Sequence, residues 1–493
     1  MDIDQLEGPS RAGANEYDEL LASALGAKEA SYDRATANYV NLDAKFKTTK
    51  RSYERQYAQL YYARLMTLRP TMRERVQQLW PGIEISNILE VQENKEVAVI
   101  GTLYKDMKLK PSILDEYSKD RGLKAALGAT NFCSETDTLV LEDDGARMAL
   151  APAPGAGAVL RVAELVTGVV LAVRGVHEPG GDFVVSDVAY AGMAPQPRAL
   201  HLPAAADNSN QQQHLGAGDK YVALMSGLSL GSLKADNLQI QLALDFLTGN
   251  LGSPWEQRLA SRVVRLVVAG GCVGQLEAMA VAAGSNPYSR QQQGLALQPV
   301  KDLDMYLTEV AAAMPVDVMP GADDPANVAL PQQPVHRCLL PGCSSYGSFV
   351  RATNPHALEV DGVTLLGTSG QNIDDMAKYC TVSDRLLLME HSLEWRHIAP
   401  TAPDTLTCYP YCDNDPFLME ATPHVYFIGN QPEFETRLVQ QPSQRPGGPP
   451  GPVVRLIAVP SFARSGTLVL LNLRTLQCHP IRFDGSMQAS GPL

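Results

Sequence analysis

The sequence lacks a long hydrophobic run, an excess of basic residues and an apolar leader segment. No apolar run approaches the roughly 18 residues that mark a membrane-spanning helix, so we expect no transmembrane segment. The opening segment, MDIDQLEGPS, is acidic and polar, which argues against a signal peptide. Lysine and arginine number 41 against 54 aspartate and glutamate, a net charge of −13. This balance argues against coating duplex DNA or an anionic membrane, because phosphate neutralisation needs excess basic residues.

Paired cysteines and nucleotide-binding loops are also missing. The 8 cysteines are scattered without a C-x-x-C pair, which indicates a reducing intracellular compartment rather than a disulfide framework or a zinc site. Two groups could still hold a metal: Cys408 with Cys412, and His336 with Cys338 and Cys343. Neither group has further ligands at the usual spacing, so free thiols are the favoured interpretation. Neither a G-x-x-x-x-G-K-[ST] loop nor a G-x-S-x-G elbow is present.

What is present is the composition of a large globular protein. The 493 residues are 45% hydrophobic and 19% charged, which is enough to build several buried cores. At roughly 150 residues per domain, this length suggests about two to four domains. We expect a polar N-terminal tail over 1–44, a helical and β domain over 45–200, a low-complexity spacer over 201–218, and an α/β domain over 219–493. The proline- and glycine-rich stretch at about 440–452 is expected to be a disordered loop.

Basic residues gather between residues 45 and 75, beside an apolar pattern of helical spacing. Leu60, Leu65 and Leu68 lie on one face of a predicted amphipathic helix that Pro70 ends. A capping-box pattern directly after the proline predicts a second helix and therefore a helical hairpin. The cationic outer face of this hairpin is a candidate contact for a partner or for DNA, and it comprises Arg51, Arg55, Arg64, Arg69, Arg73 and Arg75. The alternative is a solvated surface that only balances nearby acidic residues.

Strand patterns separated by turn compositions fill residues 88–195. Val97–Leu103 is β-branched and apolar, and further pairs of strands flank the turns Glu142–Gly145 and Pro179–Asp182. Roughly five strands over about 100 residues fit a small Greek-key barrel such as an OB-fold. Such barrels often bind single-stranded nucleic acid through aromatic side chains and basic grooves. Because this segment is poor in both, contact with protein is favoured over contact with nucleic acid.

Strands alternate with helices after residue 219. Apolar strands are predicted over 221–225, 262–269, 316–319, 363–366, 425–428, 454–459 and 467–471. Amphipathic helices are predicted between the first three of them. This alternation predicts βαβ units whose central strands are buried on both faces.

The residues that follow these strands resemble the frame of the metallophosphoesterase (calcineurin-like) family without its ligands. In that family, two metal ions held by Asp, Asn and His side chains at the strand ends activate a water. The corresponding positions here are Gly227, Ser229, Gly271, Gly274, Ala322, Asp323, Ser369, Asn430 and Pro432. Hard cations need several converging oxygen or imidazole donors, which glycine, alanine and proline cannot supply. We therefore expect an α/β sandwich that has lost its metal ligands, with no metal, no cofactor and no catalytic residue.

Several segments also resemble the small (B) subunits of eukaryotic DNA polymerase delta. They are Gly101–Lys105, Lys110–Leu114, Leu139–Asp143, Pro315–Gly321, Leu330–Pro334, Leu366–Asn372, Arg396–Leu406 and Pro423–Phe427. The resemblance implies an OB-fold followed by an inactive phosphodiesterase domain, in a non-catalytic scaffold of nuclear DNA replication and repair. It implies two partners: the C-terminal cysteine-rich metal module of the polymerase's catalytic subunit, and a third subunit that binds the sliding clamp. Contact with DNA would be weak or indirect.

Three alternatives remain open at this point. A residual phosphodiesterase or nuclease would show metal-dependent turnover, and a single-strand-binding OB module would show tight, salt-dependent binding. The small subunit of another replicative polymerase is the third alternative, although the run Pro400–Leu406 favours polymerase delta. His397 is interpreted as a hydrogen-bonded structural residue, because no nucleophile with an orienting partner is visible.

Overall fold

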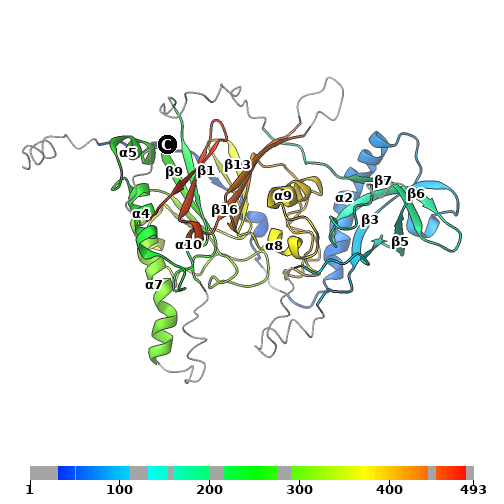
Figure 1. Ribbon diagram of the computed structural model, residues 1–493, viewed down its shortest axis with the longest axis horizontal. Coiled ribbons are helices and arrows are strands. Elements are labelled where there is room, and N and C mark those ends of the chain that lie inside the picture. Colours follow the sequence, from blue (N-terminus) through cyan, green and yellow to red (C-terminus); the bar gives the residue numbers. More distant parts are fainter. Residues whose placement is uncertain are drawn as a thin grey trace, which may run out of the picture.

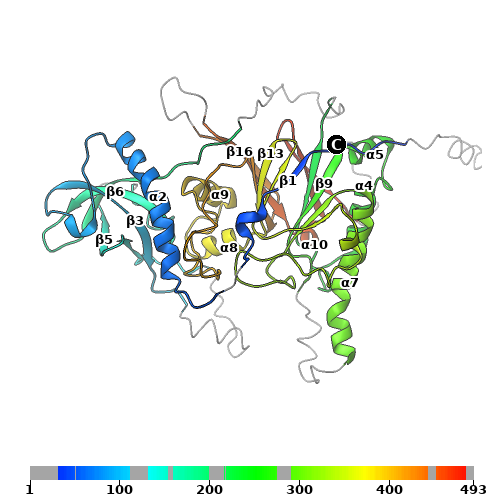
Figure 2. The ribbon, with the colours of Figure 1, turned by 180° about the vertical axis from the view of Figure 1, so that it is seen from behind.

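The computed structural model describes residues 31–49, 52–111, 131–153, 159–198, 216, 218–274, 290–441 and 451–484. A β-barrel with a long helix lies at one end of the molecule, and an α/β sandwich lies at the other (Figures 1 and 2). The described strands form three six-stranded sheets. No helix within the described ranges is both long enough and apolar enough to cross a membrane.

The barrel is built between residues 85 and 190. Its strand order is β2-β3-β4-β5-β7-β6, and an additional pairing of β3 with β6 closes the ring. The elements are β2 (Ile85–Ser86), the 3-10 helix η2 (Ile88–Glu90), β3 (Glu96–Asp106), β4 (Thr138–Glu142), β5 (Arg147–Pro152), β6 (Val170–His177) and β7 (Phe183–Tyr190). Residues alternate between buried and more exposed along β4 and β5, as expected for strands with one face toward a core. The five-stranded barrel predicted from the sequence is confirmed.

One long helix covers the barrel, so the predicted helical hairpin is wrong. Helix α2 runs over Ala58–Leu79 with Pro70 inside it. A proline inside a helix removes one backbone hydrogen bond and costs about 3 kcal/mol. The apolar face nevertheless continues across the proline, because Leu68, Met72 and Val76 are buried in one cluster with residues of β3 and β6. Burying side chains of this kind contributes roughly 1.5–3 kcal/mol each, which outweighs the lost hydrogen bond.

The second half of the chain folds into two sheets that lie face to face. One sheet has the order β1-β12-β13-β14-β16-β15, and the other has the order β11-β10-β9-β8-β17-β18. The first sheet contains β1 (Tyr39–Asn41), β12 (His356–Val360), β13 (Val363–Thr368), β14 (Val425–Gln431), β15 (Glu435–Gln440) and β16 (Val453–Pro460). The second contains β8 (Tyr221–Met225), β9 (Val263–Ala269), β10 (Val316–Met319), β11 (Phe349–Arg351), β17 (Thr467–Asn472) and β18 (Cys478–Arg482). Every residue of β8, β9 and β10 is buried, which confirms the prediction for the central strands.

Helices cover the outer faces of the two sheets. Helices α4 (Asn237–Thr248), α5 (Pro254–Ala260) and α7 (Arg290–Ala313) share a core with the sheet that contains β8. Helices α8 (Gln371–Lys378) and α9 (Arg385–Glu394) lie on the barrel side of the other sheet (Figure 1). The remaining short helices are η1 (Asp43–Phe46), η3 (Cys343–Ser345) and α10 (Phe462–Ser465). A separate apolar cluster fills the space between the two sheets.

The predicted tail over 1–44 is wrong at its C-terminal end. Strand β1 pairs antiparallel with β12, more than 300 residues further along the chain. The 3-10 helix η1 follows, with Asp43 and Phe46 buried. A three-residue strand is too short to show a periodic pattern, so no local signal predicts it. Residues 1–30 lie outside the described residues.

Two other predicted segments fall mostly outside the described residues. Of the predicted spacer over 201–218, the structure describes only Gly216 and Gly218. Of the predicted disordered loop over 440–452, residues 442–450 are not described, while Gln440 ends strand β15.

Candidate functional site

The strand-end positions that the sequence singled out do meet in space. Gly227 follows β8, Gly271 follows β9 and Asn430 lies in β14. A Cβ atom at Gly227 would lie 2.8 Å from Asn430 Oδ1, and one at Gly271 would lie 3.0 Å from the Gly227 Cα. Both glycines have positive φ angles, of 64° and 68°. The two positions are therefore closed to longer side chains both by space and by backbone conformation.

Asn430 ties the strand ends together through hydrogen bonds. Its Nδ2 donates to the carbonyl oxygen of Ser369, 2.8 Å away, and to that of Ala269, 3.3 Å away. Its backbone N–H donates to Ser226 Oγ at 2.8 Å. The amide side chain thus links β14 to the ends of β9 and β13 without a cation.

Asp324 is a buried carboxylate at this end of the sheets. Its oxygens accept backbone hydrogen bonds from Gly271 (2.9 Å), Val273 (2.8 Å) and Gly321 (2.7 Å). Burial raises the pKa of Asp324, while these backbone donors favour the ionised form and oppose that effect. Because three amides occupy the carboxylate, its structural work is to hold the loops after β9 and β10 together.

The remaining predicted positions divide into two groups. A Cβ atom at Gly274 would lie 2.8 Å from the Ser229 carbonyl oxygen, so these two positions are also in contact. Ala322, Asp323 and Pro432 are exposed. Within the described ranges, no group of three or more His, Cys, Asp or Glu side chains is placed to hold a metal ion.

The cysteines that the sequence offered as alternative ligands have other surroundings. Burial raises the pKa of the Cys408 thiol to about 12, which disfavours the thiolate that a metal would need. His336 Nδ1 accepts a hydrogen bond from the backbone N–H of Cys338 at 3.3 Å. Cys343 is buried, and its backbone N–H donates to Asp304 Oδ1 at 3.0 Å.

A buried ion pair joins the barrel to the sandwich. Arg64 Nε in α2 lies 2.8 Å from Asp415 Oδ2, and both side chains are 0% exposed. The guanidinium also donates to the carbonyl oxygens of Gly168 (2.8 Å), Pro400 (2.9 Å) and Ala402 (2.6 Å). One arginine from the helix therefore holds a barrel loop and a sandwich loop at the same time. We call this set of contacts the Arg64 joint.

His397 completes the Arg64 joint. Its Nε2 lies 2.8 Å from Asp415 Oδ2, and its Nδ1 accepts the backbone N–H of Ala399 at 3.1 Å. Burial and the nearby Arg64 lower the pKa of His397 to about 4, so the imidazole is neutral at pH 7. Burial alone would raise the pKa of Asp415, but His397 and Arg64 hold it well below its usual range. His397 is thus hydrogen-bonded as predicted.

Gly168 allows the barrel to approach this joint closely. Its φ angle is +91°, and a Cβ atom there would lie 2.7 Å from Arg64 Nη1 and would overlap the Pro400 carbonyl oxygen. A second buried contact lies nearby, where Lys105 Nζ of β3 donates to the Tyr379 carbonyl oxygen at 3.0 Å. Lys105 Nζ is also 3.8 Å from Asp137 Oδ2, and the lysine side chain is 0% exposed.

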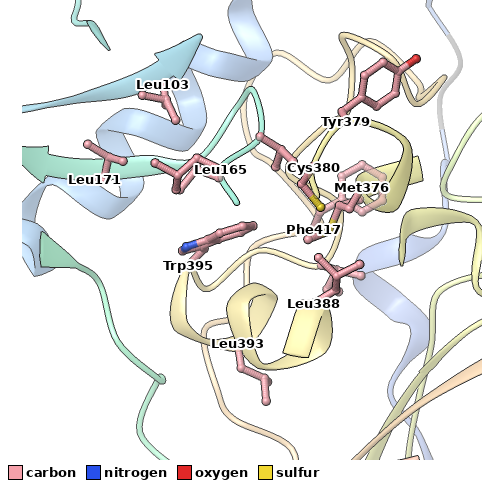
Figure 3. Close-up of a cluster of buried hydrophobic side chains, with 14 of the residues drawn as sticks. Leu103, Leu165, Leu171, Met376, Tyr379, Cys380, Leu388, Leu393, Trp395 and Phe417 are labelled. Carbon is pink, nitrogen blue, oxygen red and sulfur yellow. The ribbon is translucent and has the colours of Figure 1, made fainter. Parts of the chain in front are cut away.

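Apolar side chains from both units fill the space around these polar contacts. Leu103 and Leu171 of the barrel belong to the same buried cluster as Met376, Leu388 and Trp395 of the sandwich helices and the residues that follow them. Figure 3 shows the barrel side chains and the sandwich side chains converging on Leu165, which lies in the loop before β6. The two units are therefore held together by a continuous core as well as by the Arg64 joint.

Comparisons with known proteins match both units. The family model described as "DNA polymerase delta subunit OB-fold domain" matches residues 56–188, and the model of the B-type subunit of DNA polymerase alpha/epsilon matches residues 222–436. The DNA polymerase delta small subunit of Oryza sativa subsp. japonica is 44% identical, covering 93% of this chain and 100% of the relative. The chain belongs to the family of DNA polymerase delta small subunits. The relatives of that name in Arabidopsis thaliana and Saccharomyces cerevisiae are 43% and 30% identical, over 94% and 88% of this chain and 99% and 91% of the relatives.

Within this polymerase delta small subunit, the six arginines predicted on a cationic face have different surroundings. Arg64 was misassigned, because it is fully buried in the joint instead of facing outward. Arg69 pairs with Asp144 at 2.6 Å, and Arg75 is half-buried. Arg55 and Arg73 are exposed, and Arg51 lies outside the described residues. The position of Arg64, four residues from both Leu60 and Leu68 on the apolar face, was the signal that could have identified it.

Sequence reasoning also missed a charged cluster that anchors the N-terminal segment of the polymerase delta small subunit. His356 Nδ1 lies 2.7 Å from Asp43 Oδ1, and its Nε2 lies 3.3 Å from Asp317 Oδ2. Arg265 forms an ion pair with Asp317 and stacks on the Tyr39 ring, with its Cζ 3.5 Å from the ring centroid. Burial would lower the pKa of His356, but the two carboxylates raise it to about 9. The imidazole is therefore charged at pH 7 and links β1 to both sheets.

Proposed function

We propose that the chain is a non-catalytic scaffold subunit of DNA polymerase delta. Its two working units are the helix and barrel within 45–200 and the α/β sandwich within 219–493. The scaffold would hold the C-terminal cysteine-rich metal module of the catalytic subunit and, at the same time, a third subunit that binds the sliding clamp. It would act in the nucleus during DNA replication and repair, and any polymerase activity would belong to the catalytic subunit.

The packing of the strand ends is the observation that carries this proposal. In a two-metal phosphoesterase, aspartates would occupy the positions of Gly227 and Gly271. Here a side chain at either glycine would meet Asn430, and a side chain at Gly227 would also meet Ser461. Asp324, the carboxylate nearest to these positions along the loops, already binds three backbone amides. This arrangement favours an inactive, structurally reinforced phosphodiesterase domain.

The core shared by the barrel and the sandwich supports a scaffold role. A scaffold must hold two partners at a fixed distance and orientation, which requires that its own units do not move against each other. The Arg64 joint and the continuous apolar cluster meet this requirement. Interfaces between permanent partners usually bury about 2,000 Å² or more, and a rigid two-unit body supplies large surfaces of this kind.

The proposal is tested by co-purification of the full-length chain with tagged catalytic subunit. Wild-type chain is expected to remain bound through gel filtration and to recruit the third subunit into the same complex. A truncated catalytic subunit without its cysteine-rich module is the matched control and is expected to lose the chain. Retention of the chain by that truncated subunit, or failure of the third subunit to join, would contradict the proposed bridge.

The enzymatic alternative has its own readout. The purified chain is assayed with manganese, a bis-aryl phosphate ester and single-stranded DNA, before and after chelation. We expect no turnover that depends on manganese. Reproducible metal-dependent turnover that Asn430→Ala abolishes would replace the scaffold proposal with a phosphodiesterase or nuclease.

A further inference from the structure

A cavity of about 340 Å³ lies beneath the N-terminal segment that leads into β1. This size falls within the range of small-molecule sites, roughly 300–1,000 Å³. Half of the wall comes from the N-terminal segment, and the rest comes from β9, the end of α7 and β12. The residues that line it are Arg34, Ala35, Thr36, Ala37, Tyr39, Val264, Arg265, Ala313, Pro315 and Val360.

The charged groups in this wall are all positive. Arg34 and Arg265 contribute two guanidinium groups, and the lining contains no Asp or Glu. Arg265 is only 7% exposed, and its ion-pair partner Asp317 is shared with the charged His356. The carboxylate and the two cationic groups therefore already balance one another on the inner side of Arg265.

Arg34 has no carboxylate partner among the described residues. Its guanidinium donates to the carbonyl oxygens of Leu247 (2.6 Å), Ala260 (3.0 Å) and Val263 (2.9 Å). Burial lowers the pKa of Arg34, and no anionic group opposes that effect. A partly buried positive charge solvated only by neutral dipoles favours a nearby anion, because the attraction is stronger away from bulk water.

The remaining wall is apolar, so the cavity suits an anion with a hydrophobic body. Ala37, Val264, Pro315 and Val360 face this space together with the Tyr39 ring. We propose that the cavity binds a small organic carboxylate, with the carboxylate against Arg34 and Arg265 and the apolar body against Val264, Pro315 and Val360. The carboxylate could belong to a free small molecule or to the C-terminus of a peptide, and the two sources share the same recognition chemistry.

Binding would be coupled to the attachment of the N-terminal segment. The segment is held by the backbone bond from the Ala35 N–H to the Ser261 carbonyl oxygen and by the bond from the Leu42 N–H to the Ala357 carbonyl oxygen, both 2.8 Å long. A ligand that binds only the attached segment stabilises it by RT ln(1 + [L]/Kd). The carboxylate therefore slows hydrogen exchange at these two amides.

The test uses full-length chain and benzoate as the probe, with affinity measured by ligand-observed NMR. Benzamide supplies the same ring without the charge, and inorganic phosphate supplies an anion without the ring. We expect benzoate to bind at least about tenfold more tightly than either, a difference of about 1.4 kcal/mol. A leucine-terminated peptide is compared with its C-terminally amidated form to distinguish the source of the carboxylate. Tighter binding of the free-acid peptide than of benzoate assigns the site to peptide ends, and the reverse assigns it to small molecules.

Two variants connect binding to this cavity. Ala313→Leu narrows the cavity and is expected to weaken benzoate about tenfold, while the exposed neighbour Ala312→Leu serves as the matched control with unchanged affinity. Arg34→Gln is expected to abolish the preference for benzoate over benzamide, with folding checked by circular dichroism. Equal binding of benzoate and benzamide, equal binding of benzoate and phosphate, or no effect of Ala313→Leu would each overturn the proposal. So would benzoate binding that leaves exchange at Ala35 and Leu42 unchanged.

Discussion

Replacing Arg64 with methionine tests whether the joint holds the barrel and the sandwich together. The substitution keeps the length of the side chain and removes its charge and its donors. It leaves the Asp415 carboxylate, which is 0% exposed, without its cationic partner, and it leaves the carbonyl oxygens of Gly168, Pro400 and Ala402 without theirs. Removing one partner of a buried ion pair costs about 3–5 kcal/mol. We therefore expect Arg64→Met to lower the free energy of unfolding by about 4 kcal/mol.

The assay is urea unfolding followed by tryptophan fluorescence. Trp395 is 2% exposed and lies in the apolar cluster shared by both units, so its emission reports on the joint (Figure 3). Arg69→Met is the matched control on the same helix, because the Arg69–Asp144 pair has side chains that are 15% and 44% exposed. Exposed pairs contribute about 1 kcal/mol or less.

A double variant separates the ion pair from general damage to the core. Replacing both partners of a buried pair with apolar residues is often nearly neutral, because no charge is left without a partner. Arg64→Met combined with Asp415→Leu is therefore expected to be less destabilised than the sum of the two single variants. The reasoning is refuted if Arg64→Met unfolds within about 1 kcal/mol of Arg69→Met, or if the two single effects simply add.

Three further predictions concern pH and the strand ends. Because the pKa of His397 falls from 6.5 to about 4 on folding, its contribution to stability is present above pH 6.5 and is lost as the pH falls toward 4. Urea titrations between pH 7 and 4 should show a shallower loss for His397→Gln, and equal slopes would contradict this. Because the pKa of His356 rises to about 9, its contribution is fully present below pH 6.5 and is lost as the pH rises through 9; His356→Gln should remove this alkaline loss in the same assay, and an unchanged loss would argue against it. Gly271→Asp should lower the thermal midpoint without creating manganese-dependent phosphodiesterase activity, since the side chain would meet Asn430 at a φ of +68°; a stable variant that binds manganese would disprove the crowding argument.

Local patterns explain why many elements could be predicted from the sequence. The strands over 221–225 and 316–319 are the predicted ones, because continuous apolar runs identify strands that are covered on both faces. The five barrel strands were recognisable from turn compositions between β-branched runs. The strand-end glycines pointed to the correct meeting place, since parallel strands place their carboxyl ends at one edge of a sheet.

The errors arose where long-range packing overrode a local signal. Pro70 is normally a helix-ending residue, yet the apolar face of α2 continues past it onto the barrel. Arg64 was assigned to an outward face because arginine is usually solvated, whereas its partner Asp415 lies 351 residues away. No window of sequence contains both residues.

The amino-acid sequence by itself determined the two kinds of unit in this protein, their order along the chain and the glycines that displace ligands at the strand ends. These properties depend on periodicity and side-chain type, which act over a few residues. Only the tertiary structure decided how the units are joined, through Arg64 and Asp415, and where the N-terminal segment attaches, through His356 and its two carboxylates. Such contacts join residues that are hundreds of positions apart, and their energy comes from burying opposite charges together, which no local pattern records.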